Sequence, residues 1–112
     1  SYLSPRVPVG PAGVLAHELG HVLVAAVRLQ ENHVQSSSFY KALKDGLGGG
    51  RKWMKEAKKV SKTAGENVEE LVAESVSEVL MGTPSTTALK VYGILTQYLD
   101  EGFQLDRAVN QF

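Results

Sequence analysis

The sequence predicts a mainly α fold, arranged as one compact helical domain over residues 1–112. A chain of 112 residues is long enough to bury a single hydrophobic core. Apolar residues recur at helical spacing in several segments, whereas no segment shows the alternation typical of a half-buried strand. Prolines at positions 5, 8 and 11 exclude a helix at the start, so residues 1–11 form an extended lead-in with at most one short edge strand. Because the lead-in is so short, we expect a fragment of a longer polypeptide.

The first expected helix covers about residues 12–30 and should be the central one. Pro11 suits its first turn, and Leu15, Leu19 and Val22 recur at helical spacing. Further apolar residues make this helix apolar on nearly every side. A helix of this kind is expected to be buried.

Four more helices are expected, at about 36–45, 51–62, 68–81 and 84–101. The second begins at a run of serines and ends before the glycine run at 48–50. Asn67 caps the fourth helix, which ends at Gly82. Thr83 and Pro84 then provide the cap and the first turn of the fifth.

The composition narrows the class of partner and the chemistry of any site. The chain has 12 basic and 12 acidic residues, so its net charge gives no attraction to nucleic acid or to an anionic membrane. It has no cysteine, so a metal site must be built from His, Asp and Glu. The most apolar stretch, Val14 to Val27, is shorter than the roughly 20 residues of a membrane span, and the first residues do not resemble a signal peptide. A secreted, a virion and a cytoplasmic location all remain open.

The helix expected over 51–62 concentrates the basic residues. It has six lysines and arginines against the single Glu56, a charge of +5 that leaves −5 for the rest of the chain. Such a run is usually a solvated helix face, and it is the only feature that suggests nucleic acid or phosphate as a partner.

The segment His17-Glu18-Leu19-Gly20-His21 predicts a zinc site. Its two histidines are four residues apart, so both imidazoles lie on one helix face and reach one ion. Glu18 projects beside the metal, where it can act as a general base toward a water that the ion has acidified. If these polar residues were buried without a ligand, the cost would be several kcal/mol. Gly20 costs about 1 kcal/mol inside a helix, which is easier to explain if something approaches its backbone closely.

A catalytic zinc ion needs a third protein ligand, and Glu70 is the first choice. Glu70 and Glu74 share a helix face, and stacking like charges four residues apart is unfavourable unless a cation compensates them. Glu74 could then accept the free ring N–H of a ligating histidine. Glu69 and Glu74 remain alternative ligands, and so does His33. Three aspartates lack supporting context: Asp45, Asp100 and Asp106.

The position of Glu70 also has an explanation that needs no metal ion. It falls three residues after the Asn67 cap, where a glutamate completes a capping box on a solvated acidic face. The HExxH segment upstream favours the zinc interpretation.

With both segments together, the chain resembles the gluzincin type of zincin metallopeptidase, in which an ExxAE-like segment completes HExxH. The gap from His21 to Glu70 and the run Asn67-Val-Glu-Glu-Leu-Val-Ala-Glu74 look most like the anthrax lethal factor catalytic domain. Zincin-like domains of phage head-morphogenesis proteins and bacterial toxins are similar. The resemblance implies zinc on two histidines and Glu70, Glu18 as the general base, and a protein or peptide substrate.

Two departures from the family favour an alternative function. Lethal-factor-like domains have a tyrosine seven residues before the ligand glutamate, where its hydroxyl stabilises the oxyanion, and this chain has Thr63. Either another donor replaces it, among Tyr40, Tyr92, Tyr98 and His33, or turnover is weak. The sheet that precedes HExxH in many zincins is also missing. The alternative is a weak or inactive zincin-like structural or interaction module of a larger assembly, such as a phage virion protein or a toxin.

Overall fold

The computed structural model describes residues 10–30, 37–82 and 84–102, and all regular structure in these residues is helical. This confirms the prediction of a mainly α fold. The elements are α1 (Pro11–Gln30), α2 (Ser37–Gly46), α3 (Lys52–Ala57), the 3-10 turn η1 (Thr63–Gly65), α4 (Val68–Met81) and α5 (Thr86–Gly102). The strand allowed before the first helix falls in residues 1–9, outside the described part of the chain.

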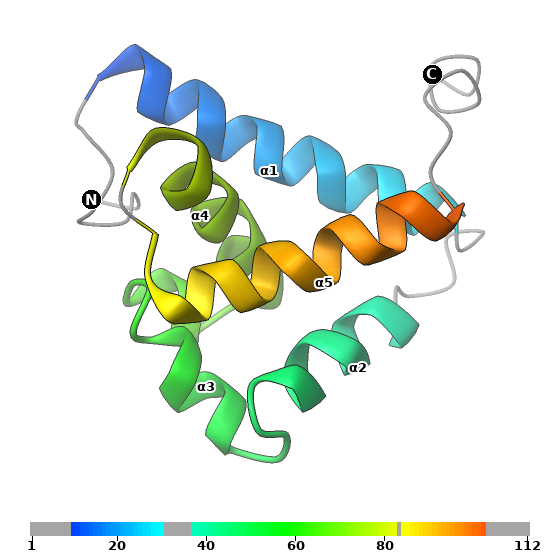
Figure 1. Ribbon diagram of the computed structural model, residues 1–112. Helices are drawn as coiled ribbons and strands as arrows, with labels where there is room; N and C mark the ends of the chain where they lie inside the picture. Colours follow the sequence, from blue (N-terminus) through cyan, green and yellow to red (C-terminus); the bar gives the residue numbers. More distant parts are fainter. Residues whose placement is uncertain (1–9, 31–36, 83, 103–112) are drawn as a thin grey trace.

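Helix α4 is the centre of the fold. It packs against α1 on one side and α5 on the other, while α2 and α3 lie on the side of α5 away from α1 (Figure 1). Residues 71–78 of α4 are all buried. The core around them is made of aliphatic and aromatic side chains from every helix, including Val24, Val27, Phe39, Leu43, Leu71, Val76, Val91 and Leu95. The sequence predicted α1 for this central place, and that prediction is wrong.

Helix α1 instead exposes one of its apolar sides. Leu15, Leu19 and Val22, expected to face the core, are 69%, 43% and 54% exposed. The buried side of α1 carries Gly20 and other small residues, which let α1 lie much closer to α4 than leucines would allow. Close helix contact rather than maximal apolar burial therefore decides which side of α1 faces inward.

The ends of the other helices follow local caps. The Asn67 side chain accepts hydrogen bonds from the backbone N–H groups of Glu69 and Glu70, at 2.8 and 3.3 Å, which confirms the predicted cap of α4. Helix α5 begins at Thr86, two residues later than expected, because Ser85 and not Thr83 caps it: the Ser85 hydroxyl accepts the Ala88 N–H at 3.1 Å.

The basic segment departs most from expectation. Its α-helix ends at Ala57, and the chain then turns through residues 58–62 into η1. Val60 in the turn and Ala64 in η1 are buried in the core. None of the described helices is long and apolar enough to cross a membrane.

Candidate metal centre

The candidate site forms where α1 crosses α4. Gly20 lies against the backbone of Ala73 so closely that a Cβ atom at position 20 would be 2.4 Å from the Ala73 Cα atom. This contact brings the face of α1 that carries His17 and His21 onto the first turn of α4, where Glu70 lies. A glycine inside a helix lowers helix stability, so the sequence predicted that something lies close to the backbone at Gly20. The Ala73 backbone does so.

The three predicted ligands come together at short distances. The Nε2 atoms of His17 and His21 are 3.2 Å apart. One carboxylate oxygen of Glu70 is 3.2 Å from His17 Nε2, and its other oxygen is 3.1 Å from His21 Nε2. With one donor atom from each residue, all three donors lie within 4.8 Å of one another.

The separation of the two histidine nitrogens fits a zinc ion. Ligand atoms bound tetrahedrally at about 2.0–2.1 Å lie about 3.3 Å from each other, which is close to the 3.2 Å between the two Nε2 atoms, while the two contacts of Glu70 involve different oxygens of its carboxylate. Two imidazole nitrogens and a carboxylate are also the ligand types that zinc takes in the absence of thiolates. One side of the cluster remains partly open, because His21 and Glu70 have side chains that are 26% and 28% exposed.

The protonation of His17 suits a metal ligand. The side chain is buried, and burial lowers the pKa of His17 below its ordinary value, although the negative charge of Glu70 opposes this. A lowered pKa keeps the imidazole neutral near pH 7, and the neutral ring is the form that binds a metal ion.

Glu18 is the charged side chain that follows the candidate ligand His17 in the sequence. It lies next to His17 on α1 but on the exposed side of the helix, and its charge raises the pKa of His17. It is therefore near the ligand cluster while remaining in contact with solvent, from which a reacting water would come.

Glu69 approaches the second histidine from its other side. Its Oε1 atom is 3.8 Å from His21 Nδ1, while His21 Nε2 faces Glu70. Glu69 is therefore close to His21 Nδ1, the ring nitrogen that does not face Glu70. Glu70 contacts the Nε2 atoms of both histidines.

Glu74 is buried and bonded to a part of the chain that the sequence did not connect with the site. Its carboxylate accepts hydrogen bonds from the hydroxyls of Ser61 and Thr63, the latter at 2.6 Å. Burial raises the pKa of Glu74, and the two hydroxyl donors oppose that rise. The predicted support of a ligating histidine by Glu74 stays a prediction. Ser61 was missed because it lies in a turn with no periodic pattern.

The contact with Glu74 occupies the Thr63 hydroxyl, which stands where lethal-factor-like domains have a tyrosine. Of the alternative donors, Tyr98 donates its hydroxyl to the backbone oxygen of Ser38 in the first turn of α2, at 3.0 Å. Asp45, a weaker ligand candidate, is paired with Lys41 at 2.6 Å on α2. His33 and Asp106 lie outside the described residues, as does the Asp100 side chain.

Comparisons of the chain with protein-family models, with curated proteins and with solved structures found no match. The chemistry of the site residues is therefore the basis for a function.

Proposed function

We propose that this chain is a zinc-dependent metallopeptidase domain that hydrolyses peptide bonds in a protein or peptide substrate. The observation that supports this best is the convergence of His17, His21 and Glu70 at distances that suit zinc, with Glu18 exposed beside them. When bound, zinc lowers the pKa of a coordinated water and polarises a substrate carbonyl.

The residues of the chain have distinct tasks in this proposal. His17, His21 and Glu70 hold the ion and leave one side of it open toward solvent. Glu18 takes a proton from the attacking water and returns it to the nitrogen of the leaving amine. Leu15, Leu19 and Val22 are exposed apolar side chains on α1 close to Glu18 in the sequence, and in this proposal they contact the substrate.

The test combines metal analysis with digestion of an unbiased peptide library by the purified full chain. We expect one zinc ion per chain and cleavage of peptides. Glu18→Gln should keep the zinc and lower cleavage by about 10²–10⁴-fold, because it removes only the base. His17→Ala should lose the zinc.

A matched control uses a carboxylate on another helix. Asp45→Asn should change neither zinc content nor cleavage, since Asp45 pairs with Lys41 on α2. Equal cleavage by wild type and Glu18→Gln would contradict the catalytic role of Glu18. A wild-type chain that binds no zinc would refute the proposal as a whole.

A second candidate function is a zincin-like structural or interaction module with weak or no catalysis, for example in a phage virion protein or a toxin. It is favoured by the hydrogen bond from Thr63 to Glu74, which engages the hydroxyl at the position of the family's oxyanion donor. Losing one such donor typically costs about 10²–10³ in rate. One bound zinc ion per chain without cleavage of any peptide would favour this candidate over the first.

A further inference from the structure

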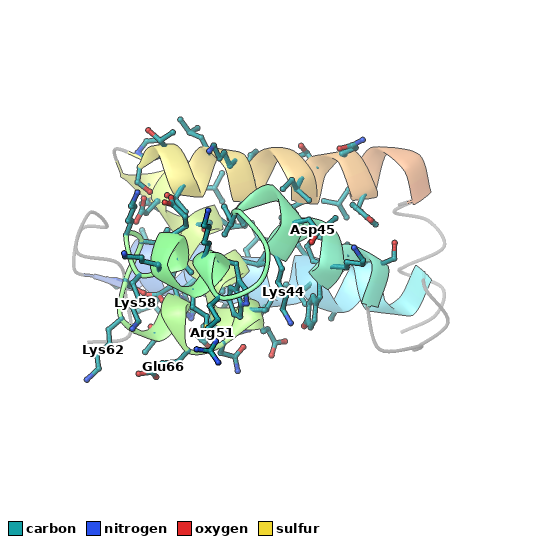
Figure 2. The ribbon with its side chains drawn as sticks, turned by 90° about the horizontal axis from the view of Figure 1, so that it is seen from below. Lys44, Asp45, Arg51, Lys58, Lys62 and Glu66 are labelled. Atoms are coloured by element: carbon teal, nitrogen blue, oxygen red, sulfur yellow. The ribbon has the colours of Figure 1, made fainter. Side chains whose placement is uncertain are left out.

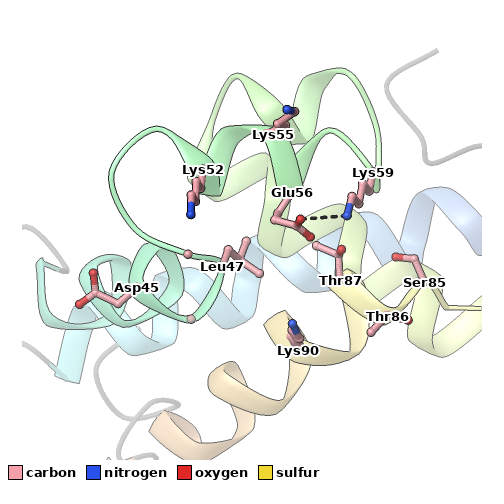
Figure 3. A pocket seen from close by; sticks show the side chains of 12 residues that line it. Asp45, Leu47, Lys52, Lys55, Glu56, Lys59, Ser85, Thr86, Thr87 and Lys90 are labelled. Carbon is pink, nitrogen blue, oxygen red and sulfur yellow. Dashed lines mark hydrogen bonds and ion pairs between the residues drawn. The ribbon is translucent and has the colours of Figure 1, made fainter.

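A second concave site lies on the side of the molecule away from α1. It is a hollow of about 1030 Å³ between the end of α2, helix α3 and the first turns of α5 (Figure 3). Segments from three parts of the chain line it, and none of the residues that hold the candidate metal centre does so. A hollow of this size is large enough for a small-molecule ligand.

Four lysines line this hollow. Lys52, Lys55 and Lys59 come from α3 and the turn after it, and Lys90 comes from α5 on the other side (Figure 3). Like charges brought together around a concave surface repel one another and focus a positive potential into it. Lys90 is about 30 positions further along the sequence than the other three lysines. The grouping of the four lysines therefore depends on the fold and not on the face of a single helix.

Two carboxylates also line the hollow, and each already has a cation. The Glu56 carboxylate accepts a hydrogen bond from Lys59 at 2.8 Å, and this bond holds the pKa of Glu56 below its ordinary value, with the charge of Lys90 adding to the effect. Asp45 pairs at 2.6 Å with Lys41, which does not line the hollow.

Three ammonium groups are therefore left to attract a ligand. Within the described part of the chain, neither Lys52 nor Lys55 nor Lys90 forms an ion pair. The exposed side chain of Thr86 lies at the same surface, where α5 begins, while Thr87 is buried and bonds to Glu56 (Figure 3). Ammonium and hydroxyl groups together are suited to phosphate oxygens, which lysine binds as a point charge.

The lining argues against a nucleic acid strand as the ligand. It contains no aromatic side chain on which a base could stack. Its two carboxylates would also repel a uniformly charged polymer that ran across it, whereas a compact ligand can avoid them.

We propose that this hollow binds a compact anion with two or more phosphate groups, held by Lys52, Lys55 and Lys90. The site is separate from the candidate metal centre and does not depend on the proposed peptidase activity. The phosphate groups could belong to a soluble oligophosphate or to the headgroup of a phosphoinositide lipid.

The test is calorimetric titration of the full chain with inorganic tripolyphosphate, without added metal. We expect saturable binding of one tripolyphosphate per chain. The double variant Lys52→Gln with Lys90→Gln should weaken binding by about a hundredfold, at about tenfold for each charge-assisted contact. Both side chains are exposed, so the variant is expected to fold.

A control variant removes the same charge elsewhere in the basic segment. Arg51 and Lys62 line a neighbouring hollow with Lys58 and Glu66; neither lines the first hollow, although Lys55 lines both. Figure 2 labels Arg51, Lys58, Lys62 and Glu66. Arg51→Gln with Lys62→Gln should weaken binding by no more than about threefold, since only screened long-range attraction is lost. An equal loss in both double variants would overturn the proposal, because general charge would then explain the binding. Absence of saturable binding would overturn it as well.

A second arm of the same experiment separates the two sources of phosphate. Phosphatidylcholine vesicles with and without a phosphoinositide bisphosphate are tested for binding of the chain and of both double variants. Binding to the phosphoinositide vesicles that fails only in the Lys52/Lys90 variant supports the site and assigns it to a lipid headgroup. Tripolyphosphate binding without vesicle binding supports the site and assigns it to a soluble ligand. Tighter binding of a single-stranded oligonucleotide, equally weakened in both double variants, would contradict the choice of a compact anion.

Discussion

Replacing Gly20 by alanine tests whether the contact between α1 and α4 builds the metal centre. A Cβ atom at this position would lie 2.4 Å from the Cα atom of Ala73 and 3.0 Å from its carbonyl oxygen. Ordinary contacts between carbon atoms are about 3.5–4.0 Å, so the two helices would have to separate by about 1 Å. Because the neighbouring atoms belong to a backbone, no side chain can rotate out of the way.

The size of the effect follows from two opposing terms. Alanine is favoured over glycine inside a helix by about 1 kcal/mol. Overpacking of a tight contact costs about 1–3 kcal/mol, and a clash with backbone belongs at the upper end. We expect Gly20→Ala to lower the free energy of unfolding by about 2 kcal/mol, which lowers Tm by about 8 °C for a domain of this length. Zinc affinity should fall as well, because His17 and His21 move away from Glu70.

The matched control is Gly93→Ala in α5. Gly93 is exposed, and a Cβ atom there would meet nothing within 4 Å. This variant keeps only the helix-propensity gain, so its Tm should rise by about 4 °C. Thermal unfolding followed by circular dichroism, with zinc titrations of both variants, measures the two effects. If Gly20→Ala proved as stabilising as Gly93→Ala, the inferred close approach of α1 to α4 would be wrong.

Three further predictions use the same unfolding measurements. Asn67→Ala removes the cap of α4 and should cost about 1 kcal/mol, whereas retention of wild-type stability would show that the cap contributes nothing. Leu19→Ser on the exposed side of α1 should change stability by no more than about 0.5 kcal/mol. Leu43→Ala in the core should lower the free energy of unfolding by about 2–5 kcal/mol. If Leu19→Ser destabilised the chain more than Leu43→Ala, the orientation of α1 would be refuted. The raised pKa of Glu74 means that its protonated form favours folding below the ordinary pKa of 4.5, an advantage that is lost as pH rises through the folded pKa. In metal-free protein, Glu74→Gln should therefore be more stable than wild type at pH 7 and equally stable near pH 4; equal stability at both pH values would contradict the shift.

The sequence was sufficient for those features that local chemistry determines. Helical spacing predicted α1, α4 and α5, and the serine run with the glycines after it predicted α2. The Asn67 side chain fixed the start of α4 because a cap acts within three residues. The convergence of His17, His21 and Glu70 was predicted too, since two histidines four residues apart can serve one ion and the acidic face of α4 needs a cation.

Features that depend on packing between helices could not be predicted in this way. Apolar residues occur all round α1, so hydrophobicity alone gave no orientation, and the Gly20 contact with Ala73 decided it. The bond from Ser61 to Glu74 joins a turn to a helix 13 residues later, and no periodic pattern records such a pair. The third helix was expected to reach residue 62 and not to end at Ala57, because helix propensity favours its basic residues throughout and marks no end in this segment.

Residues 51–62 carry +5 in a chain whose net charge is zero, so the remaining residues carry −5 between them. Near its pI of about 6.8, such a molecule still has a local positive surface that can meet a negatively charged one. Close to an anionic surface, attraction of this segment would orient the molecule with α3 toward that surface.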